Sequence, residues 1–289
     1  MKVLMLPHHK EIGKGNGVGQ VLFNYHKWFP KVGVEIITDK FADFDLSCSH
    51  LGYYNTADIH FSHGLYFGEI DDRFAECNQN IINAIRNAKS IVVPSEYVAQ
   101  TFRRELKVNP HVVPHAVNIA EWSQKENKGY VLWNKNRNTN VCNPEPLYKL
   151  ALKNPQTEFV TTFAPEDVDP IDNVKVSGSL TFDKMKSTIQ NASIYLSTAK
   201  ETFGIGTLEA LACGIPVLGY NWGGTKNIVT HKKDGYLVKP NDYNTLNEGL
   251  NWLTENRHLL IENCRQKAKQ YTWLAVVKKL KGIFENYVN

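Results

Sequence analysis

The chain has 289 residues, of which 42% are hydrophobic and 21% charged, and its formal net charge is +4. This length suits two modest domains or one large α/β unit, and the composition excludes collagen-like and low-complexity proteins. The five cysteines are scattered without a C-x-x-C pair. We therefore expect neither a disulfide framework nor a zinc site, and we expect a cytoplasmic protein. The apolar runs fall far short of the ~18 residues that indicate a membrane span, which leaves only a peripheral membrane contact open.

The first half of the chain alternates short apolar runs with segments of helical spacing. Strands are predicted at residues 3–6, 34–38, 58–62, 91–93 and 112–113. Residues 13–19 are predicted to be a glycine-rich turn that precedes a helix, and further helices are predicted around residues 81–88 and after Ser95. This βαβ rhythm predicts a mostly parallel sheet with helices on both faces.

The second half begins with a polar stretch, residues 119–129, which is predicted to be a linker. A second βαβ series follows, with strands predicted at 130–133, 158–162, 174–176, 194–197 and 216–219, and helices at 146–152, 182–190 and 206–212. Residues 242–289 are predicted to be mainly helical. The sequence therefore predicts two doubly wound halves, in which ligands bind at the carboxyl ends of the strands.

Residues 197–225 form the most informative motif, STAKETFGIGTLEALACGIPVLGYNWGGT. Glu201 lies in the loop after a predicted strand, and Glu209 lies on the first turns of the helix that Gly204 and Gly206 open. Glycines at a helix start let backbone N–H groups approach an anion, and the helix dipole favours a phosphate there. Two carboxylates beside a phosphate site can accept hydrogen bonds from sugar hydroxyls, which favours a sugar nucleotide as ligand. The plainer alternative is a solvated loop acid and a carboxylate that only complements the dipole.

This motif resembles the signature of the retaining GT-B glycosyltransferases, especially family 4, whose two glutamates are separated by seven residues. The resemblance continues through the Gly-Gly pair at 223–224 and residues 235–238, and it covers about residues 110–289. It implies an α/β GT-B fold, with two Rossmann-like doubly wound domains facing across a cleft. Residues 1–118 would form the acceptor domain, joined by a returning helix at about 273–289, and residues 119–272 would form the nucleotide-sugar donor domain.

The resemblance also implies roles for individual residues. Glu209 would bind the nucleotide ribose, and Glu201 would contact hydroxyls of the transferred sugar. His63, at a strand end before a glycine, would touch the same sugar near the reacting centre, whereas His115 is interpreted as an interdomain hinge. The basic pair that grips the diphosphate would be Lys135 and Arg137, with Arg137 replacing a lysine that the family has where this chain has Asn140. The implied donor-binding set is Lys135, Arg137, Ser179, Phe203, Gly204, Ile205, Gly206, Thr207, Glu209 and Gly17.

The implied reaction is transfer of a hexose, with retention, from a UDP-sugar or alternatively GDP-mannose to a glycan, a lipid-linked or a small-molecule acceptor. Because the basic pair and the helix start can stabilise the leaving diphosphate, we expect no metal and no cofactor beyond the donor substrate. Two D-x-D pairs, at 43–45 and 167–169, would instead favour a metal-bridged phosphate, but neither has a clear strand-end context.

Three other functions stay open at this point. A dinucleotide-binding dehydrogenase is suggested by the glycine loop, but G-x-G-x-x-G fails in both registers. A non-catalytic sugar-nucleotide-binding module and a glycosyltransferase acting on modified nucleic-acid bases are the other two. The first 118 residues carry equal numbers of basic and acidic side chains, so the net charge of +4 lies entirely in the remainder. A neutral acceptor half speaks against a nucleic-acid partner. The sequence predicts no oligomeric state.

Overall fold

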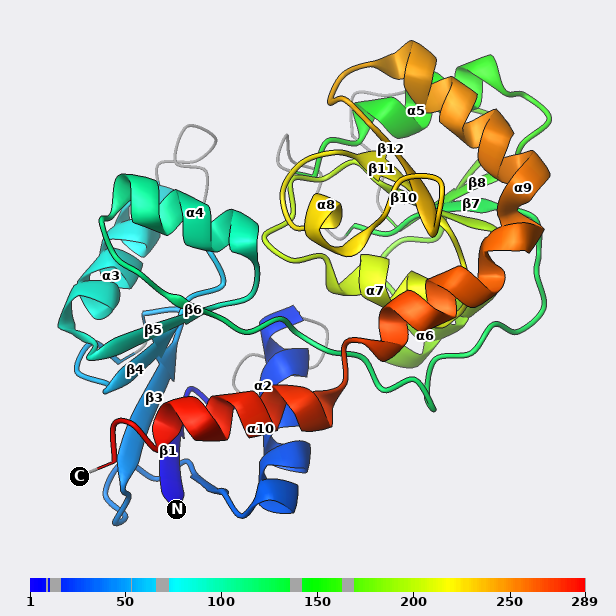
Figure 1. Ribbon diagram of the computed structural model, residues 1–289. Coiled ribbons are helices and arrows are strands. Elements are labelled where there is room, and N and C mark those ends of the chain that lie inside the picture. The colour runs from blue at the N-terminus through cyan, green and yellow to red at the C-terminus, as the bar shows by residue number, and fades with distance from the viewer. Residues whose placement is uncertain are drawn as a thin grey trace. The chain divides into compact units, whose positions relative to one another are not determined.

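The computed structural model describes residues 1–8, 10, 17–52, 54–65, 73–135, 142–162 and 169–288. The chain divides into two compact units (Figure 1). Unit 1 comprises Met1–Ala116 and Trp273–Asn289, and unit 2 comprises Val117–Thr272. Each unit contains one six-stranded parallel sheet with helices on both faces. The α/β architecture with two Rossmann-like units is therefore confirmed.

The sheet of unit 1 has the strand order β2-β1-β3-β4-β5-β6. The strands are β1 (Lys2–Leu6), β2 (Glu35–Ile37), β3 (Leu46–His50), β4 (Ile59–Phe61), β5 (Ser90–Val93) and β6 (His111–Val112). From β1 the chain first moves outward to β2 and then returns to β3 on the other side of β1. The switch in direction therefore lies between β1 and β3, which is where open α/β sheets bind ligands.

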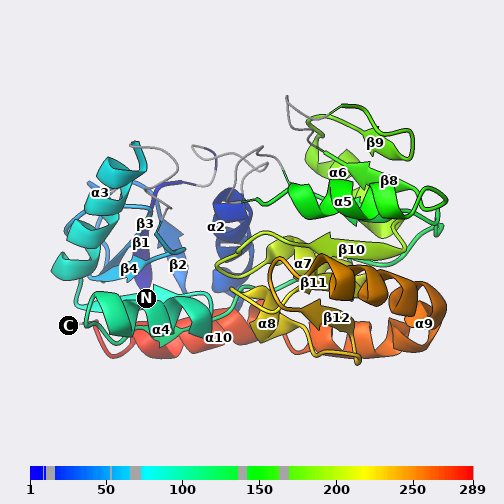
Figure 2. The same ribbon diagram turned by 90° about the horizontal axis from the view of Figure 1, so that it is seen from above.

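The helices of unit 1 form two layers. They are α2 (Gly17–Trp28), the short 3₁₀ helix η1 (Phe29–Val32), α3 (Arg73–Asn87), α4 (Glu96–Glu105) and α10 (Trp273–Phe284). α2 and α10 lie on one face of the sheet, and α3 and α4 cover the other (Figures 1 and 2). Phe284 of α10 stacks on Phe29 with ring centroids 5.5 Å apart. Because α2 begins at Gly17, the predicted turn at 13–19 was too long: its last three residues are helical, and residues 13–16 lie outside the described ranges.

Strand β3 was missed by the sequence analysis, although all five of its residues are buried. Its sequence, LSCSH, is short of apolar residues, so it carries no strand signal. The buried hydroxyls are satisfied by the next strand along the sheet, β4, and by the residue directly before it. Ser47 Oγ donates to Asp58 Oδ2 at 2.7 Å, and Ser49 Oγ lies 3.0 Å from His60 Nδ1. Hydrogen bonding between neighbouring strands thus lets a polar segment occupy the centre of the sheet.

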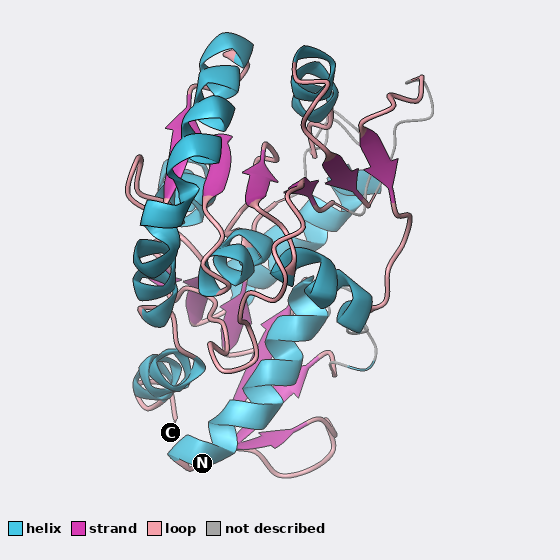
Figure 3. Ribbon diagram, turned by 90° about the vertical axis from the view of Figure 1, so that its right-hand side faces the viewer, coloured by secondary structure: helices cyan, strands magenta, loops and turns pink. Residues whose placement is uncertain are grey.

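The sheet of unit 2 has the order β12-β11-β10-β7-β8-β9. The strands are β7 (Val131–Trp133), β8 (Phe159–Thr161), β9 (Val174–Val176), β10 (Ile194–Ser197), β11 (Val217–Tyr220) and β12 (Gly235–Val238). The helices are α5 (Glu145–Lys153), α6 (Phe182–Gln190), α7 (Ile205–Ala212), α8 (Thr225–Ile228) and α9 (Tyr243–Lys269). The strands lie between α5 on one side and α6 with α7 on the other, and the long helix α9 contacts both α5 and α7 (Figures 1 and 3). Here the switch in direction lies between β7 and β10.

The segment after the unit boundary is not the linker that its polarity predicted. The side chain of Trp122 is 5% exposed and belongs to the hydrophobic core of unit 2. Its ring meets that of Phe182 edge to face, at a centroid distance of 6.4 Å. The backbone is also tied down, because the amide of Lys125 donates to the carbonyl of Gln190 at 3.0 Å. One buried aromatic side chain and backbone hydrogen bonds together fix this otherwise polar stretch on the unit.

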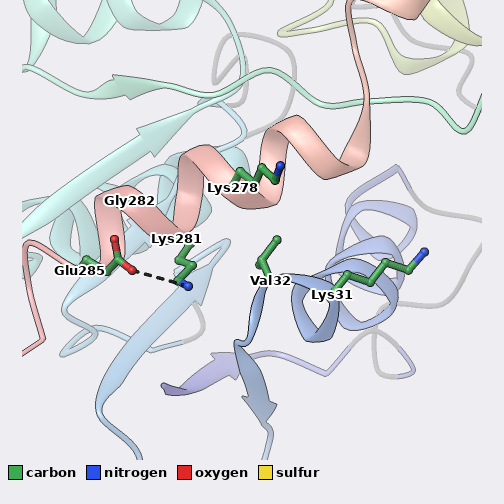
Figure 4. A pocket seen from close by; sticks show the side chains of 6 residues that line it. All are labelled: Lys31, Val32, Lys278, Lys281, Gly282 and Glu285. Atoms are coloured by element: carbon green, nitrogen blue, oxygen red, sulfur yellow. Dashed lines mark ion pairs between the residues drawn. The ribbon is translucent and has the colours of Figure 1, made fainter.

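A shallow basic groove lies between η1 and α10 in unit 1 (Figure 4). Its volume is about 370 Å³, and it is lined by Lys31, Val32, Lys278, Lys281, Gly282 and Glu285. Since η1 leads into the start of β2, the groove lies beside the amino end of the sheet, away from the carboxyl ends of the strands. Within the described ranges, every helix is too short or too polar to span a lipid bilayer.

Candidate functional site

The switch point of unit 2 brings together two residues that are far apart in the sequence. Lys135 follows β7, Glu201 follows β10, and these two strands are paired neighbours in the sheet. The Lys135 ammonium forms an ion pair with Glu201 Oε1, and the two side chains are 12% and 30% exposed. Burial opposes the charge on Lys135, but the Glu201 carboxylate outweighs it and raises the pKa of the lysine above its ordinary value. Glu201, the residue predicted to bind the sugar, and Lys135, the residue predicted to bind the diphosphate, therefore lie in direct contact.

The loop that carries Glu201 rests on the Gly223–Gly224 pair. The amide of Gly224 donates to the carbonyl of Glu201 at 2.7 Å. A Cβ on Gly224 would collide with the backbone of Phe203, and one on Gly223 would lie 2.5 Å from the carbonyl oxygen of Glu201. Gly223 also has φ +55°, in the left-handed region that favours glycine. The Gly-Gly pair is thus required because two backbone segments touch.

The start of α7 presents backbone donors that the helix itself does not use. Gly204 precedes the helix with φ +103°, and no side chain caps it. The first bond within the helix runs from the amide of Leu208 to the carbonyl of Gly204, at 3.1 Å. The amides of residues 205–207 therefore lack acceptors within the helix, and the dipole favours an anion there. The hydroxyl of Thr207 instead points into the core, where it donates to Ser197 Oγ at 3.3 Å. Of Thr207, only the backbone amide is available to a ligand.

Glu209 lies on α7 and is half-buried. Burial raises the pKa of its carboxyl to about 8, although the positive charges of Lys186 and Lys135 act in the opposite direction. No hydrogen bond of this carboxyl group is found within the described residues. Without a ligand, Glu209 is therefore largely protonated at neutral pH, which is unusual for a glutamate.

Tyr195 is a member of the site that the sequence analysis missed. It lies on β10 and is 1% exposed. Its hydroxyl would collide with a Cβ on Gly206, so the phenol touches the first turn of α7. Burial raises the pKa of Tyr195 to about 12. The charge of Lys135 lowers this pKa, and the Glu201 and Glu209 carboxylates raise it further. A tyrosine in a buried strand resembles any core residue in sequence, and only the small residue at 206 hints at the contact.

In unit 1, His63 follows β4 and belongs to a cluster of histidines. Its Nε2 lies 3.0 Å from Nδ1 of His50, the last residue of β3. The ring of His115 lies 5.5 Å from that of His63, centroid to centroid. Burial lowers the pKa of His63 to about 4, so its imidazole is neutral at physiological pH. His115, which was interpreted as a hinge residue, is itself buried beside His63 and one residue from the unit boundary.

The other residues predicted to bind the donor or a metal differ in their exposure, and some lie outside the described residues. Ser179 is exposed in the loop after β9, Phe203 is buried, and Gly17 is the exposed first residue of α2. Arg137 lies outside the described residues, as does Asp167 of one D-x-D pair. In the other pair, Asp45 Oδ2 accepts a hydrogen bond from the amide of Lys2 at 2.7 Å. No group of three or more histidine, cysteine or acidic side chains in the described part of the chain is arranged to hold a metal ion.

Comparison with known families identifies the segment that carries Glu201, Glu209 and α7. Residues 165–271 match the model of the family described as glycosyl transferases group 1. These residues belong to that family. Among the relatives of this group 1 segment, an uncharacterized glycosyltransferase of Methanocaldococcus jannaschii is 28% identical over 119 residues, which is 40% of this chain and 34% of the relative. The D-inositol 3-phosphate glycosyltransferase of Jonesia denitrificans is 30% identical over 95 residues, 32% of this chain and 22% of the relative. The matches thus span about a third or less of these relatives.

Solved structures resemble this chain over nearly its whole length. The sucrose-phosphate synthase from Thermosynechococcus elongatus has a TM-score of 0.79 at 14% identity, covering 99% of this chain and 98% of that one. Anabaena HepE in complex with UDP-glucose has a TM-score of 0.76 at 15% identity, covering 99% and 100%. At such identities the likeness establishes the fold, which is GT-B. The fold and the family that the motif implied are both confirmed.

Proposed function

We propose that this protein transfers a hexose from a nucleoside-diphosphate sugar, with a UDP-sugar as the favoured donor. The observation that carries the proposal is the contact of Lys135 with Glu201 beside the uncapped start of α7. The group 1 match over residues 165–271 and the GT-B fold shared with a protein bound to UDP-glucose support it.

In the proposed reaction, charge develops on the diphosphate as it leaves the sugar. The Lys135 ammonium and the amides at the start of α7 are donors that stabilise this charge, and on this basis we propose a metal-independent reaction that retains the anomeric configuration. An anionic diphosphate competes with Glu201 for Lys135. Binding of the donor therefore frees the Glu201 carboxylate to accept hydrogen bonds from the sugar hydroxyls. Glu209 accepts hydrogen bonds from the ribose, and neutral His63 contacts the transferred sugar.

The test compares Glu201→Gln and Glu209→Gln with Glu248→Gln, whose side chain is exposed on α9. Donor hydrolysis and transfer are followed with UDP-glucose and GDP-mannose, and nucleotide affinity by calorimetry. We expect Glu201→Gln to reduce turnover strongly with a smaller effect on UDP affinity, and Glu209→Gln to weaken nucleotide binding. If both variants transfer sugar as well as Glu248→Gln, the site is assigned wrongly. Tight donor binding without turnover of any sugar nucleotide would instead indicate a non-catalytic binding module.

A further inference from the structure

The hydroxyl of Tyr195 has no evident structural role, although it lies in the centre of the site. The residue is 1% exposed, yet no hydrogen bond of its hydroxyl is found within the described residues. The hydroxyl oxygen is not one of the fully enclosed polar atoms of these residues that lack a partner, so it can be reached from outside the protein. An accessible hydroxyl beside the start of a helix is placed to donate a hydrogen bond to a ligand.

The surroundings of this hydroxyl define the chemistry of that ligand. The phenol touches the first turn of α7 at Gly206, where the amides of residues 205–207 have no acceptor in the helix. The Lys135 ammonium is also close enough to influence the phenol. The amides and the ammonium are hydrogen-bond donors, and a phenol that keeps its proton at neutral pH adds one more. The Glu201 and Glu209 carboxylates also act on the phenol, and Glu201 is already paired with Lys135. The donors at the start of α7 suit a group that only accepts hydrogen bonds, as the oxygens of a diphosphate do.

We propose that the Tyr195 hydroxyl donates a hydrogen bond to the diphosphate of the nucleotide, next to the start of α7. The inference rests on the proposed function and adds a donor-binding residue to it. It also gives Gly206 a second reason to be glycine: a Cβ there would meet the Tyr195 hydroxyl that binds the phosphate. The same hydroxyl could reach a sugar hydroxyl instead, and the two ligands are separated by the probes below.

The test uses Tyr195→Phe, which removes one oxygen atom, and Tyr148→Phe as its matched control. Tyr148 lies on α5, also in unit 2, and its hydroxyl is buried without a partner in the described structure. Affinities for UDP, GDP, UDP-glucose and inorganic pyrophosphate are measured by calorimetry on the full chain. We expect Tyr195→Phe to weaken UDP and UDP-glucose equally, by about tenfold, as the loss of a hydrogen bond to a charged group would. The affinity of Tyr195→Phe for pyrophosphate should fall in parallel. The affinities of Tyr148→Phe should stay within about twofold of those of the unmodified protein.

A second measurement separates ligand binding from a structural role. Because the hydroxyl has no hydrogen-bond partner among the described residues, Tyr195→Phe should melt at the same temperature as the unmodified protein or higher. A lower melting temperature would assign the hydroxyl to the fold and overturn the inference. Unchanged UDP affinity, or a loss confined to UDP-glucose, would also overturn it. If the unmodified protein binds neither UDP nor GDP, the proposed function itself fails.

Discussion

Replacing Glu209 by glutamine should stabilise the ligand-free protein increasingly as the pH rises. Burial raises the pKa of the Glu209 carboxyl from its ordinary value near 4.5 to about 8. Below pH 4.5 both the folded and the unfolded chain hold this proton, so the group has no effect. Between pH 4.5 and 8 the unfolded chain releases the proton while the folded protein keeps it. Glu209 therefore lowers the free energy of unfolding progressively across this window, and the penalty is constant above it.

The size of the effect follows from the slope of the free energy of unfolding against pH. Each pH unit inside the window costs about 1.4 kcal/mol, so the unmodified protein should lose about 2.5 kcal/mol between pH 5 and 7 relative to Glu209→Gln. Urea denaturation of both proteins at pH 5, 6 and 7 measures this difference. The buried histidines, whose pKa values are lowered, give the opposite pH dependence, but they are common to both proteins and cancel.

The control for this measurement is Glu248→Gln, which removes an exposed carboxylate on α9. Its stability curve should run parallel to that of the unmodified protein over the whole range. If the difference between the unmodified protein and Glu209→Gln stays constant from pH 5 to 7, the carboxyl is solvated in the folded protein. The burial argument for Glu209 would then be wrong.

Three further predictions concern the same parts of the chain. If the ribose binds ionised Glu209, UDP binding at pH 7 should release up to one proton. The release is measured as a binding enthalpy that depends on the buffer, and Glu209→Gln should abolish it. An equal proton release from both proteins would contradict the prediction. Gly206→Ala should lower the free energy of unfolding by about 1–3 kcal/mol in urea titrations, because its Cβ meets the Tyr195 hydroxyl, and adding Tyr195→Phe should restore part of the loss. No recovery in the double variant would locate the collision elsewhere. Gly282→Ala should stabilise the protein by about 0.5–1 kcal/mol in thermal melts, since a Cβ there meets nothing within 4 Å and glycine is costly inside a helix; a lower melting temperature would argue against this.

Parts of the fold could be predicted from the sequence because their signals are local. β9, β10 and α6 have the predicted bounds, since each combines a clear period with turn residues at its ends. β3 could not be predicted, because its buried serines are satisfied by Asp58, directly before β4, and by His60 on β4. The prediction of a linker around Trp122 was wrong for the same reason, since the packing of this polar stretch depends on Phe182, far along the chain.

The site shows the same division between local and distant information. Glu201, Glu209 and the helix start form one continuous motif, so the sequence alone indicates their chemistry. The contact of Lys135 with Glu201 depends on β7 lying next to β10, although β8 follows β7 in the chain. Tyr195 could not be found at all, because a single hydroxyl distinguishes it from a packing residue. Where strand order decides which side chains meet, the sequence alone leaves the site incomplete.

The return of α10 to unit 1 has a consequence for how the chain is made. All six strands of the first sheet are synthesised before unit 2, but α10, which covers one face of that sheet, is synthesised after it. Tyr25 and Phe29 pack against Trp273 and Phe284 of this helix. While unit 2 emerges from the ribosome, these apolar side chains therefore lack their covering helix. The unit that is begun first is completed last, and the nascent chain must keep an unfinished core from aggregating throughout translation of the other unit.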